Sequence, residues 1–376
     1  MLYERDIFKQ IVESRTILVY GASVVATQVG QCLMDDPYNV RVAAFVVTHA
    51  QGNPKVVLKR PVITLEVAEQ VFPKDTLVIV ACVEKNRKSI KNELAKSVFT
   101  EVIYLTFESD LWTGIRGNYM RSRLDNLGYR YRLLQEELRE LKEEVEAQEK
   151  TIGVYRAVSQ YDKELTEDIS NYDWEDEIFV GAALSDKCSC RLRDDVGDNI
   201  STENRKYCEL TALYWLWKNA TADYVGLCHY RRHFCLSEKE RAKLLKSDID
   251  VVVTVPVMNY PCVLEIYERD HDPDDWKVMK KAIMVKQPDY LFDLIKVERG
   301  NFYFGYNMFI AKNQIFKDYC KWLFDILDYC NKHCIPKEDA YQNRFLGFLG
   351  ERLLTVYMLH HYDDFKIAIA DKHFVE

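Results

Sequence analysis

The segment GLCHYRRHF, residues 226–234, places two histidines and two arginines directly after the apolar pair Tyr224-Val225. A guanidinium presents a planar fork of N–H donors that matches phosphate oxygens, and a neighbouring histidine adds a donor that titrates near neutral pH. His229, Arg231 and Arg232 therefore indicate an anion site at the end of a strand. An ordinary charged strand end would carry the same residues, so both interpretations stay open.

The charge of the whole chain disfavours a third interpretation, a nucleic-acid interface. The 376 residues include 51 Lys and Arg against 59 Asp and Glu, a net charge of −8. Proteins that bind nucleic acid broadly carry a basic excess instead. Any anion site must therefore be built locally.

Two further segments carry groups that could hydrogen-bond the hydroxyls of a sugar or ribose. The first is the polar loop CSCRLRDDVGDNIS and the residues just after it, with the candidates Asp195, Asp198, Asn199 and Asn204. A simple turn would also explain this loop, since Gly, Asp and Asn favour turns. The second is NFYFGYNMFIAK (301–312), where Asn307 lies among rings that could stack on a sugar or fill a core.

A general base has several candidates. YERDHDPDDW (267–276) is expected to form a loop and offers His271 and Asp274, although a solvated turn would look the same. RFLGFLGERLL (344–354) is expected to be helical and offers Glu351, with Arg352 beside it as an anion-binding neighbour. Asp339 is a weaker third choice.

No metal site is predicted. Cys188-x-Cys190 and Cys330-x3-Cys334 lack a second ligand pair at zinc-site spacing. The acidic triplet Asp248-Ile249-Asp250 precedes its predicted strand rather than ending it, which is typical of a turn or cap.

The elements that must position these residues follow an α/β pattern from residue 151 onward. Strands are predicted at 151–159, 178–184, 224–228 and 250–256, and a helix from the N-cap candidate Ser201 to about Asn219. Ligands of open α/β sheets gather at the carboxyl ends of the strands. His229, Arg231 and Arg232 would lie at such an end.

The first third, residues 1–115, indicates a Rossmann-like domain. An apolar run, a Gly turn, a helix-period stretch and a second apolar run fill residues 16–47. Gly21 occupies the place of the first phosphate-turn glycine, but Ser23 and Ala26 replace the other two, so Gly21 is a weak cofactor-binding candidate. A packing domain without a dinucleotide is the alternative, and an NAD-dependent redox function is disfavoured.

Residues 116–150 read as a helical connector. Leu134, Leu138, Leu141 and Val145 follow 3-4 spacing with charged residues between them, which predicts a coiled coil over residues 129–150 and self-association through it. A helix docked on one domain is the alternative.

Residues 150–376 carry four motifs in one order: GDNIS, NRKYCELTALYWLWKN with DYVGLCHYRRHF, YNMFIAK, and RFLGFLGERLL. With these motifs the region resembles a family of glycosyltransferases from bacterial capsular and exopolysaccharide clusters that includes galactofuranosyltransferase-type enzymes. The N-terminal part resembles the small Rossmann-like domains found beside such enzymes.

This resemblance implies a GT-A type α/β domain over 151–376 with a nucleotide-diphosphate sugar as donor. UDP-galactofuranose is the candidate donor, and a glycan or lipid-linked molecule the acceptor. Enzymes of this type place D-x-D where His229-Tyr230-Arg231 stands, so cationic side chains would replace the metal and no cofactor is required. A non-catalytic, nucleotide-sensing scaffold that assembles through the coiled coil is the alternative function.

The sequence also predicts a cytoplasmic protein with peripheral membrane contact at most. It opens without a signal-peptide pattern, and no apolar run reaches the ~20 residues that a transmembrane helix needs.

Overall fold

The computed structural model describes residues 2–106, 109–141, 150–186 and 190–375. They form two compact units, Met1–Arg130 and Tyr131–Glu376, which are described separately. The boundary falls inside the connector expected at 116–150, so helix α5 (Asp110–Asn126) belongs to unit 1 and helix α6 (Leu134–Glu140) to unit 2.

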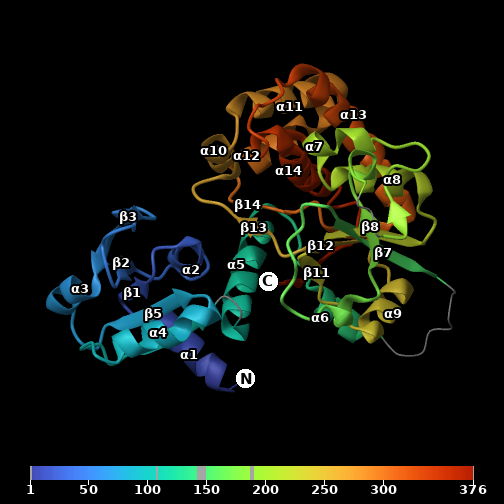
Figure 1. Cartoon of the computed structure of the whole chain (residues 1–376). Coiled ribbons are helices and arrows are strands. Elements are labelled where there is room, and N and C mark those ends of the chain that lie inside the picture. The colour runs from blue at the N-terminus through green and yellow to red at the C-terminus, as the bar shows by residue number, and fades with distance from the viewer. Residues whose placement is uncertain (1, 107–108, 142–149, 187–189, 376) are drawn as a thin grey trace. The chain divides into compact units, whose positions relative to one another are not determined.

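Unit 1 contains the predicted parallel sheet, with the strand order β3-β4-β2-β1-β5-β6 and only β3 antiparallel to its neighbour (Figure 1). Its strands are β1 Ile17–Tyr20, β2 Val42–Val47, β3 Val56–Val57, β4 Arg60–Thr64, β5 Leu77–Cys82 and β6 Val102–Thr106. Its other helices are α1 Leu2–Glu13, α2 Val24–Met34, α3 Leu65–Val71 and α4 Glu84–Leu94.

Gly21 lies in the turn between β1 and α2 with a positive φ of 124°. A Cβ at this position would lie 2.9 Å from the carbonyl oxygen of Ala81, on the neighbouring strand β5. Backbone conformation and packing therefore both require glycine here. A cofactor role for Gly21 stays a prediction.

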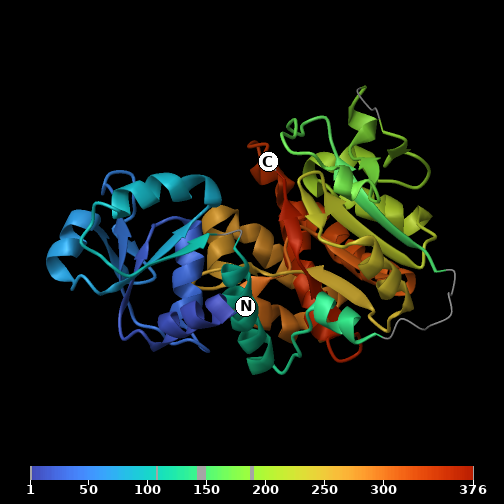
Figure 2. The same ribbon diagram turned by 90° about the horizontal axis from the view of Figure 1, so that it is seen from below.

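Unit 2 is built on a larger mixed sheet with the order β16-β12-β15-β10-β7-β8-β9, in which β15 alone is antiparallel to its neighbours. Figure 2 shows these strands side by side. The strands are β7 Ile152–Val158, β8 Asp176–Phe179, β9 Leu192–Arg193, β10 Tyr224–His229, β12 Val251–Thr254, β15 Phe309–Lys312 and β16 Ile367–Ala370. Short strands β11 Arg232–Phe234 and β17 Lys372–Phe374 extend from β10, and β13 Val257–Met258 pairs with β14 Phe302–Tyr303.

Helices pack on both faces of this sheet and on one another. They are α7 Asn204–Tyr207, α8 Leu210–Asn219, α9 Glu238–Lys246, α10 Val263–Asp270, α11 Pro273–Lys286, α12 Leu291–Arg299, α13 Asn313–His333 and α14 Phe345–His360. Alternate residues of a strand point to opposite faces. Tyr224 and Cys228 accordingly join Leu134 of α6 and Leu244 of α9 in one apolar cluster, while α13 packs on β10 and β15.

The predicted helix over residues 129–150 is not continuous, which corrects the coiled-coil prediction. Residues 129–133 are not helical, and α6 ends at Glu140. Leu134 and Leu138 are 0% and 2% exposed in the core of unit 2. Their apolar stripe is thus buried within the chain itself, as in the docked-helix alternative, and residues 142–149 lie outside the described residues.

The acidic segment 267–276 also differs from its prediction. It forms the end of α10 and the start of α11 instead of a loop, with Asp272 capping α11 through Asp274 N. Within the described residues no helix combines the length and the apolar character that crossing a bilayer requires.

Candidate functional site

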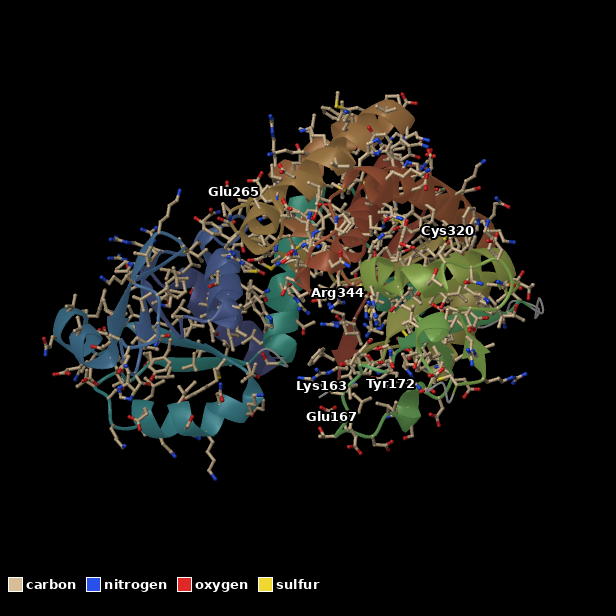
Figure 3. All side chains as sticks on the ribbon, turned by 45° about the horizontal axis from the view of Figure 1, so that its top comes forward. Lys163, Glu167, Tyr172, Glu265, Cys320 and Arg344 are labelled. Carbon is tan, nitrogen blue, oxygen red and sulfur yellow. The ribbon has the colours of Figure 1, made fainter. Side chains whose placement is uncertain are left out.

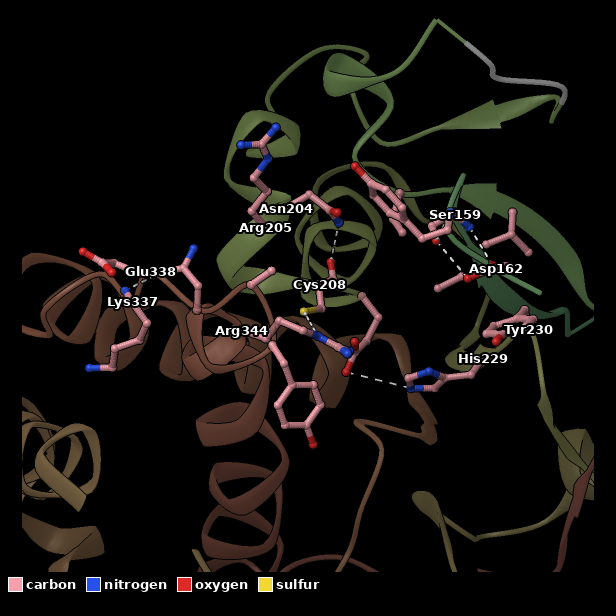
Figure 4. A pocket seen from close by; sticks show the side chains of 18 residues that line it. Ser159, Asp162, Asn204, Arg205, Cys208, His229, Tyr230, Lys337, Glu338 and Arg344 are labelled. Carbon is pink, nitrogen blue, oxygen red and sulfur yellow. Dashed lines mark hydrogen bonds and ion pairs between the residues drawn. The ribbon is translucent and has the colours of Figure 1, made fainter. Parts of the chain in front are cut away.

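A cleft of about 800 Å³ opens at the carboxyl ends of β7 and β10 (Figure 4). These strands are parallel neighbours, with His229 opposite Ala157, so both end at the same edge of the sheet. Segments far apart in the sequence complete the walls, and the lining residues are Ala157, Val158, Ser159, Tyr161, Asp162, Val180, Asn204, Arg205, Cys208, Glu209, His229, Tyr230, Lys337, Glu338, Ala340, Tyr341, Asn343 and Arg344. The position is the one where open α/β sheets bind ligands.

Two guanidinium groups contribute positive charge to this cleft. Arg205 comes from α7, and Arg344 from η5 (Gln342–Arg344), immediately before α14. Arg344 Nε donates a hydrogen bond to Cys208 Sγ at 3.0 Å. Lys337 also lines the cleft, but its ammonium pairs with Asp272 and Asp275 at 2.8 and 2.9 Å. The two arginines are therefore the cations best placed to meet an anionic ligand.

Glu209 is the buried carboxylate of the cleft, 8% exposed. Its Oε1 accepts a hydrogen bond of 2.6 Å from Asn307 Nδ2 and lies 3.9 Å from His229 Nε2. His229 Nε2 is 2.5 Å from the carbonyl oxygen of Tyr306. Burial lowers the pKa of Arg344, but the neighbouring Cys208 and Glu209 raise it by more, so the pKa of Arg344 lies above its ordinary value.

A second acidic group follows β7. Asp162 accepts hydrogen bonds from the backbone N–H and the hydroxyl of Ser159, at 2.7 and 2.8 Å. Burial raises the pKa of Asp162, although the bonds from Ser159 and the nearby His229 work in the opposite direction. Both oxygens of Asp162 are therefore engaged in closing the turn that shapes one wall.

The backbone next to Glu209 is strained. Cys208 has φ 53° and ψ −130°, a conformation that side-chain-bearing residues rarely adopt, and it breaks the helix that the sequence predicts over 201–219. Tyr306 and Asn307, with φ 70° and 51°, are two more residues in the left-handed region. These three positions all border Glu209 or its partner, and such strain clusters at functional sites.

Helix α14 approaches this strained segment through two glycines. A Cβ on Gly350 would lie 2.7 Å from Leu210 Cδ1 and 3.2 Å from Asn307 Oδ1, and one on Gly347 would lie 3.4 Å from Cys208 Sγ. The motif RFLGFLGERLL therefore places its glycines where α14 meets the 204–210 segment. Close packing here fixes Glu209 and Arg344 relative to one another.

Of the predicted site residues, the structure brings His229 and Asn204 into the cleft. Asn204 Nδ2 donates to Cys208 O and Thr211 Oγ1, at 2.8 and 3.0 Å, so it also holds the break between α7 and α8. Asn307 lies one layer behind the cleft, 1% exposed and bonded to Glu209.

Arg231 and Arg232 are not in the cleft lining. The chain reverses after His229 into β11, which pairs with β17. Arg231 consequently donates to Val375 O at 3.0 Å and stacks on Phe374, while the guanidinium of Arg232 lies 4.2 Å from the ring centre of Tyr306. The strand end that the sequence singled out borders the cleft through His229, but Arg231 and Arg232 lie outside the cleft lining.

The loop 194–199 also lies outside the cleft lining. Asp195 forms an ion pair with Arg193 at 2.6 Å, which lowers its pKa. Asp198 accepts a hydrogen bond from Tyr214 at 3.0 Å, and Asn199 Nδ2 donates to Asp195 O and Gly197 O. These bonds are those of the simple turn that was the alternative for this loop.

The predicted bases lie elsewhere as well. His271, between α10 and α11, stacks on Phe348 with ring centres 4.0 Å apart, and burial followed by Arg352 lowers its pKa to about 4. Asp274 is an exposed residue paired with Lys277. None of these groups lines the cleft.

Glu351 and Arg352 are on α14, as expected, and pair with each other at 2.8 Å. Glu351 accepts the Tyr306 N–H at 3.1 Å, and burial raises its pKa. Arg352 is 5% exposed and lies over the ring of Tyr303. Both therefore support the 303–307 segment rather than the cleft lining.

A cluster of metal-ligand types lies away from the cleft lining. Among the described residues, Glu175, Cys228 and His233 bring one ligand atom each within 4.8 Å of the others. His233 Nδ1 is only 2.6 Å from Glu175 Oε2, a direct hydrogen bond, and Arg156 Nη1 is 3.9 Å from the same carboxylate. A neighbouring guanidinium disfavours a cation, so the cluster fits a buried ion-pair network better than a metal centre. Figure 3 shows Tyr172, which stacks on His233, on the same segment as Lys163 and Glu167.

Sequence reasoning did not select Arg205, Glu209 or Arg344 as functional residues. Arg205 and Glu209 are inside the motif NRKYCEL, and Arg344 opens RFLGFLGERLL, so a signal existed in the motifs themselves. What the sequence could not show is that a backbone break at Cys208 brings the two motifs together.

Comparison with solved structures gives a likeness to the apo structure of WbbM, a bifunctional glycosyltransferase. The match has 27% sequence identity and a TM-score of 0.53, and it covers 60% of this chain and 45% of the WbbM chain. The chain thus spans less than half of WbbM. No curated protein matches the chain.

The sequence pattern of a protein family described as "Domain of unknown function (DUF4422)" matches residues 165–362. This range contains the carboxyl end of β10, the strained Cys208 and both cleft arginines. Since the match spans more than half of the 376 residues, the chain belongs to the DUF4422 family.

Proposed function

We propose that unit 2 is a glycosyltransferase that moves a sugar from a nucleoside-diphosphate donor to a hydroxyl of a glycan or lipid-linked acceptor. The observation that carries this proposal is the cleft at the carboxyl ends of β7 and β10, with Arg205 and Arg344 in its wall. The likeness to WbbM, a bifunctional glycosyltransferase, supports it independently.

The chemistry of transfer explains why two guanidinium groups suit this cleft. The bond between the anomeric carbon and the β-phosphate oxygen breaks, and negative charge accumulates on the departing diphosphate. Cations in the wall of a cleft stabilise that charge. We assign this role to Arg344 and Arg205, with His229 as a further donor at the strand end.

We further propose that donor binding needs no divalent metal. His229-Tyr230 stands at the end of β10, and the acidic triplet Asp248-Ile249-Asp250 is engaged elsewhere, because Asp248 pairs with Lys366 and Asp250 with Lys312. Cationic side chains would then replace the ion. UDP-galactofuranose is the first donor to test, and the role would lie in bacterial surface polysaccharide synthesis.

The test is a panel of sugar nucleotides incubated with the purified protein, with and without EDTA, and scored for transfer and hydrolysis. Turnover that persists in EDTA supports the proposal. Turnover that EDTA abolishes would contradict the metal-free diphosphate site alone. Binding of a nucleotide without any turnover would favour the nucleotide-sensing scaffold instead.

Arginine variants locate the donor site. A hydrogen bond to a charged group contributes about 1.5–3 kcal/mol, so Arg344→Met or Arg205→Met should weaken donor binding by about 10- to 150-fold. Arg299→Met, which changes an exposed arginine at the end of α12, is the matched control and should leave the dissociation constant unchanged. If calorimetry gives the same donor affinity for all three variants, the diphosphate does not bind at Arg205 and Arg344.

A further inference from the structure

The proposed transfer needs a group that accepts the proton of the acceptor hydroxyl, and the cleft contains three carboxylates. Glu338 is exposed at the rim. Asp162 uses both oxygens on Ser159. Glu209 is buried, faces the cleft and has Oε1 fixed by Asn307. Among the described residues, no hydrogen bond engages Glu209 Oε2.

A chain of contacts holds Glu209 in place through Asn307 and Tyr306. Asn307, its hydrogen-bond donor, is 1% exposed and adopts the left-handed conformation together with Tyr306. The Tyr306 peptide is held on both sides, since Glu351 accepts its N–H and its carbonyl oxygen contacts His229. This arrangement fixes Asn307, and Asn307 in turn fixes one oxygen of Glu209 and leaves the other toward the cleft.

The strain at Cys208 points to the same residue. A side-chain-bearing residue in such a conformation costs on the order of 1–3 kcal/mol and persists when the surrounding packing enforces it. Here the strained residue directly precedes Glu209, and its thiol accepts a hydrogen bond from Arg344. The strained Cys208 thus connects two groups of the cleft: its thiol contacts the Arg344 guanidinium, and Glu209 is the next residue in the chain.

From this geometry we propose that Glu209 is the general base of the transfer, with Asn307 as its positioning residue; the inference rests on the function proposed above. Oε2 of Glu209 takes the proton of the acceptor hydroxyl while that oxygen bonds to the anomeric carbon. The bond from the anomeric carbon to the β-phosphate oxygen breaks, and its electron pair leaves with the nucleoside diphosphate. One carboxylate then suffices, and the anomeric configuration inverts.

The deciding variant is Glu209→Gln, which keeps the shape and an acceptor for Asn307 but removes the basicity. General bases contribute about 10²- to 10⁴-fold, so kcat should fall by at least about 100-fold while the donor dissociation constant changes by less than about threefold. Glu203→Gln is the matched control, because Glu203 pairs with Lys206 outside the cleft lining. It should keep the parental kcat.

Two further measurements separate a base from other roles. In Glu209→Ala, added formate should restore part of kcat, because a small carboxylate can occupy the space left by the side chain. Intact-mass spectrometry during turnover should find no sugar attached to the protein. A covalent sugar on Glu209 would overturn the proposal and make the residue a nucleophile in a retaining reaction.

The remaining outcomes are equally decisive. If Glu209→Gln does not fold, Glu209→Asp replaces it: the carboxylate stays but moves back by one methylene, and kcat should fall about 10- to 100-fold. Full activity of either variant, or a loss confined to donor affinity, overturns the role of Glu209 and leaves the proposed function standing. A parental protein that turns over no sugar nucleotide overturns both.

Discussion

Leu138 tests whether the leucine stripe of the connector serves the core of unit 2 or a second chain. It is 2% exposed and packs with Leu134, Val154 and Leu244. Replacing a buried leucine by alanine removes its apolar contacts and leaves a cavity, at a cost of about 2–5 kcal/mol. For a domain of this size a loss of about 3 kcal/mol lowers the melting temperature by about 6–12 °C.

The assay is urea and thermal unfolding of Leu138→Ala, followed by tryptophan fluorescence over a wide range of protein concentration. The control is Leu127→Ala, because Leu127 belongs to the same connector but is 39% exposed, and it should lose less than about 1 kcal/mol. A core role predicts a loss that is independent of concentration. Two results together would refute the core role and support self-association through residues 129–150. The unfolding midpoint would shift with protein concentration, and light scattering would give Leu138→Ala a smaller mass than the parental protein.

Three further predictions concern stability. The pKa of His271 is lowered from 6.5 to about 4 in the folded chain, so between these pH values the unfolded chain binds a proton that the folded chain does not. The free energy of unfolding should therefore fall as the pH drops from 6.5 to about 4. In His271→Gln the midpoint of urea unfolding should lose this dependence on pH. Gly350→Ala should lower the free energy of unfolding by about 1–2 kcal/mol, despite the better helix propensity of alanine, because the new Cβ would clash with Leu210. Gly114→Ala is the control: the space around Gly114 is open, so this variant should be more stable by up to about 1 kcal/mol. Higher stability in both variants would refute the packing argument. Glu175→Gln should cost about 1.5–3 kcal/mol in urea unfolding, because it removes the buried carboxylate that His233 contacts at 2.6 Å and Arg156 at 3.9 Å, while Arg156 keeps its pair with Glu177; a neutral effect would count against the ion-pair network.

Contiguous apolar residues predicted the place of several strands of unit 2, although the strand predicted at 178–184 ends at Phe179 and residues Ala182–Leu184 form a 3-10 helix. The strand predicted at 151–159 became β7 (Ile152–Val158), and the strand predicted at 224–228 became β10, because a buried strand is encoded by local hydrophobicity. His229 reached the cleft for the same reason, since its position depends only on where that strand ends.

The rest of the site depends on contacts that no local pattern contains. Arg344 meets Cys208 across 136 residues of sequence, and the helix predicted over 201–219 breaks because packing against α14 imposes a strained conformation on Cys208. Arg231 was expected in the site because the tight reversal into β11 could not be foreseen. Leu134 and Leu138 are a further example, because a heptad spacing of leucines does not reveal whether the same chain or a second chain covers them.

The close contacts of Gly347 and Gly350 on α14 restrict changes near Cys208, Leu210 and Asn307 but not at the rim of the cleft. Glu209 in the cleft and Asn307 behind it are interlocked, so a change at one must be matched by its neighbours. Glu338, Ala340 and Tyr341 on the rim are exposed and lie on the irregular stretch before α14. If the proposed transfer is correct, exchanging rim side chains is therefore the simplest way to alter the acceptor in the laboratory, because it leaves the interlocked contacts of Glu209 in place.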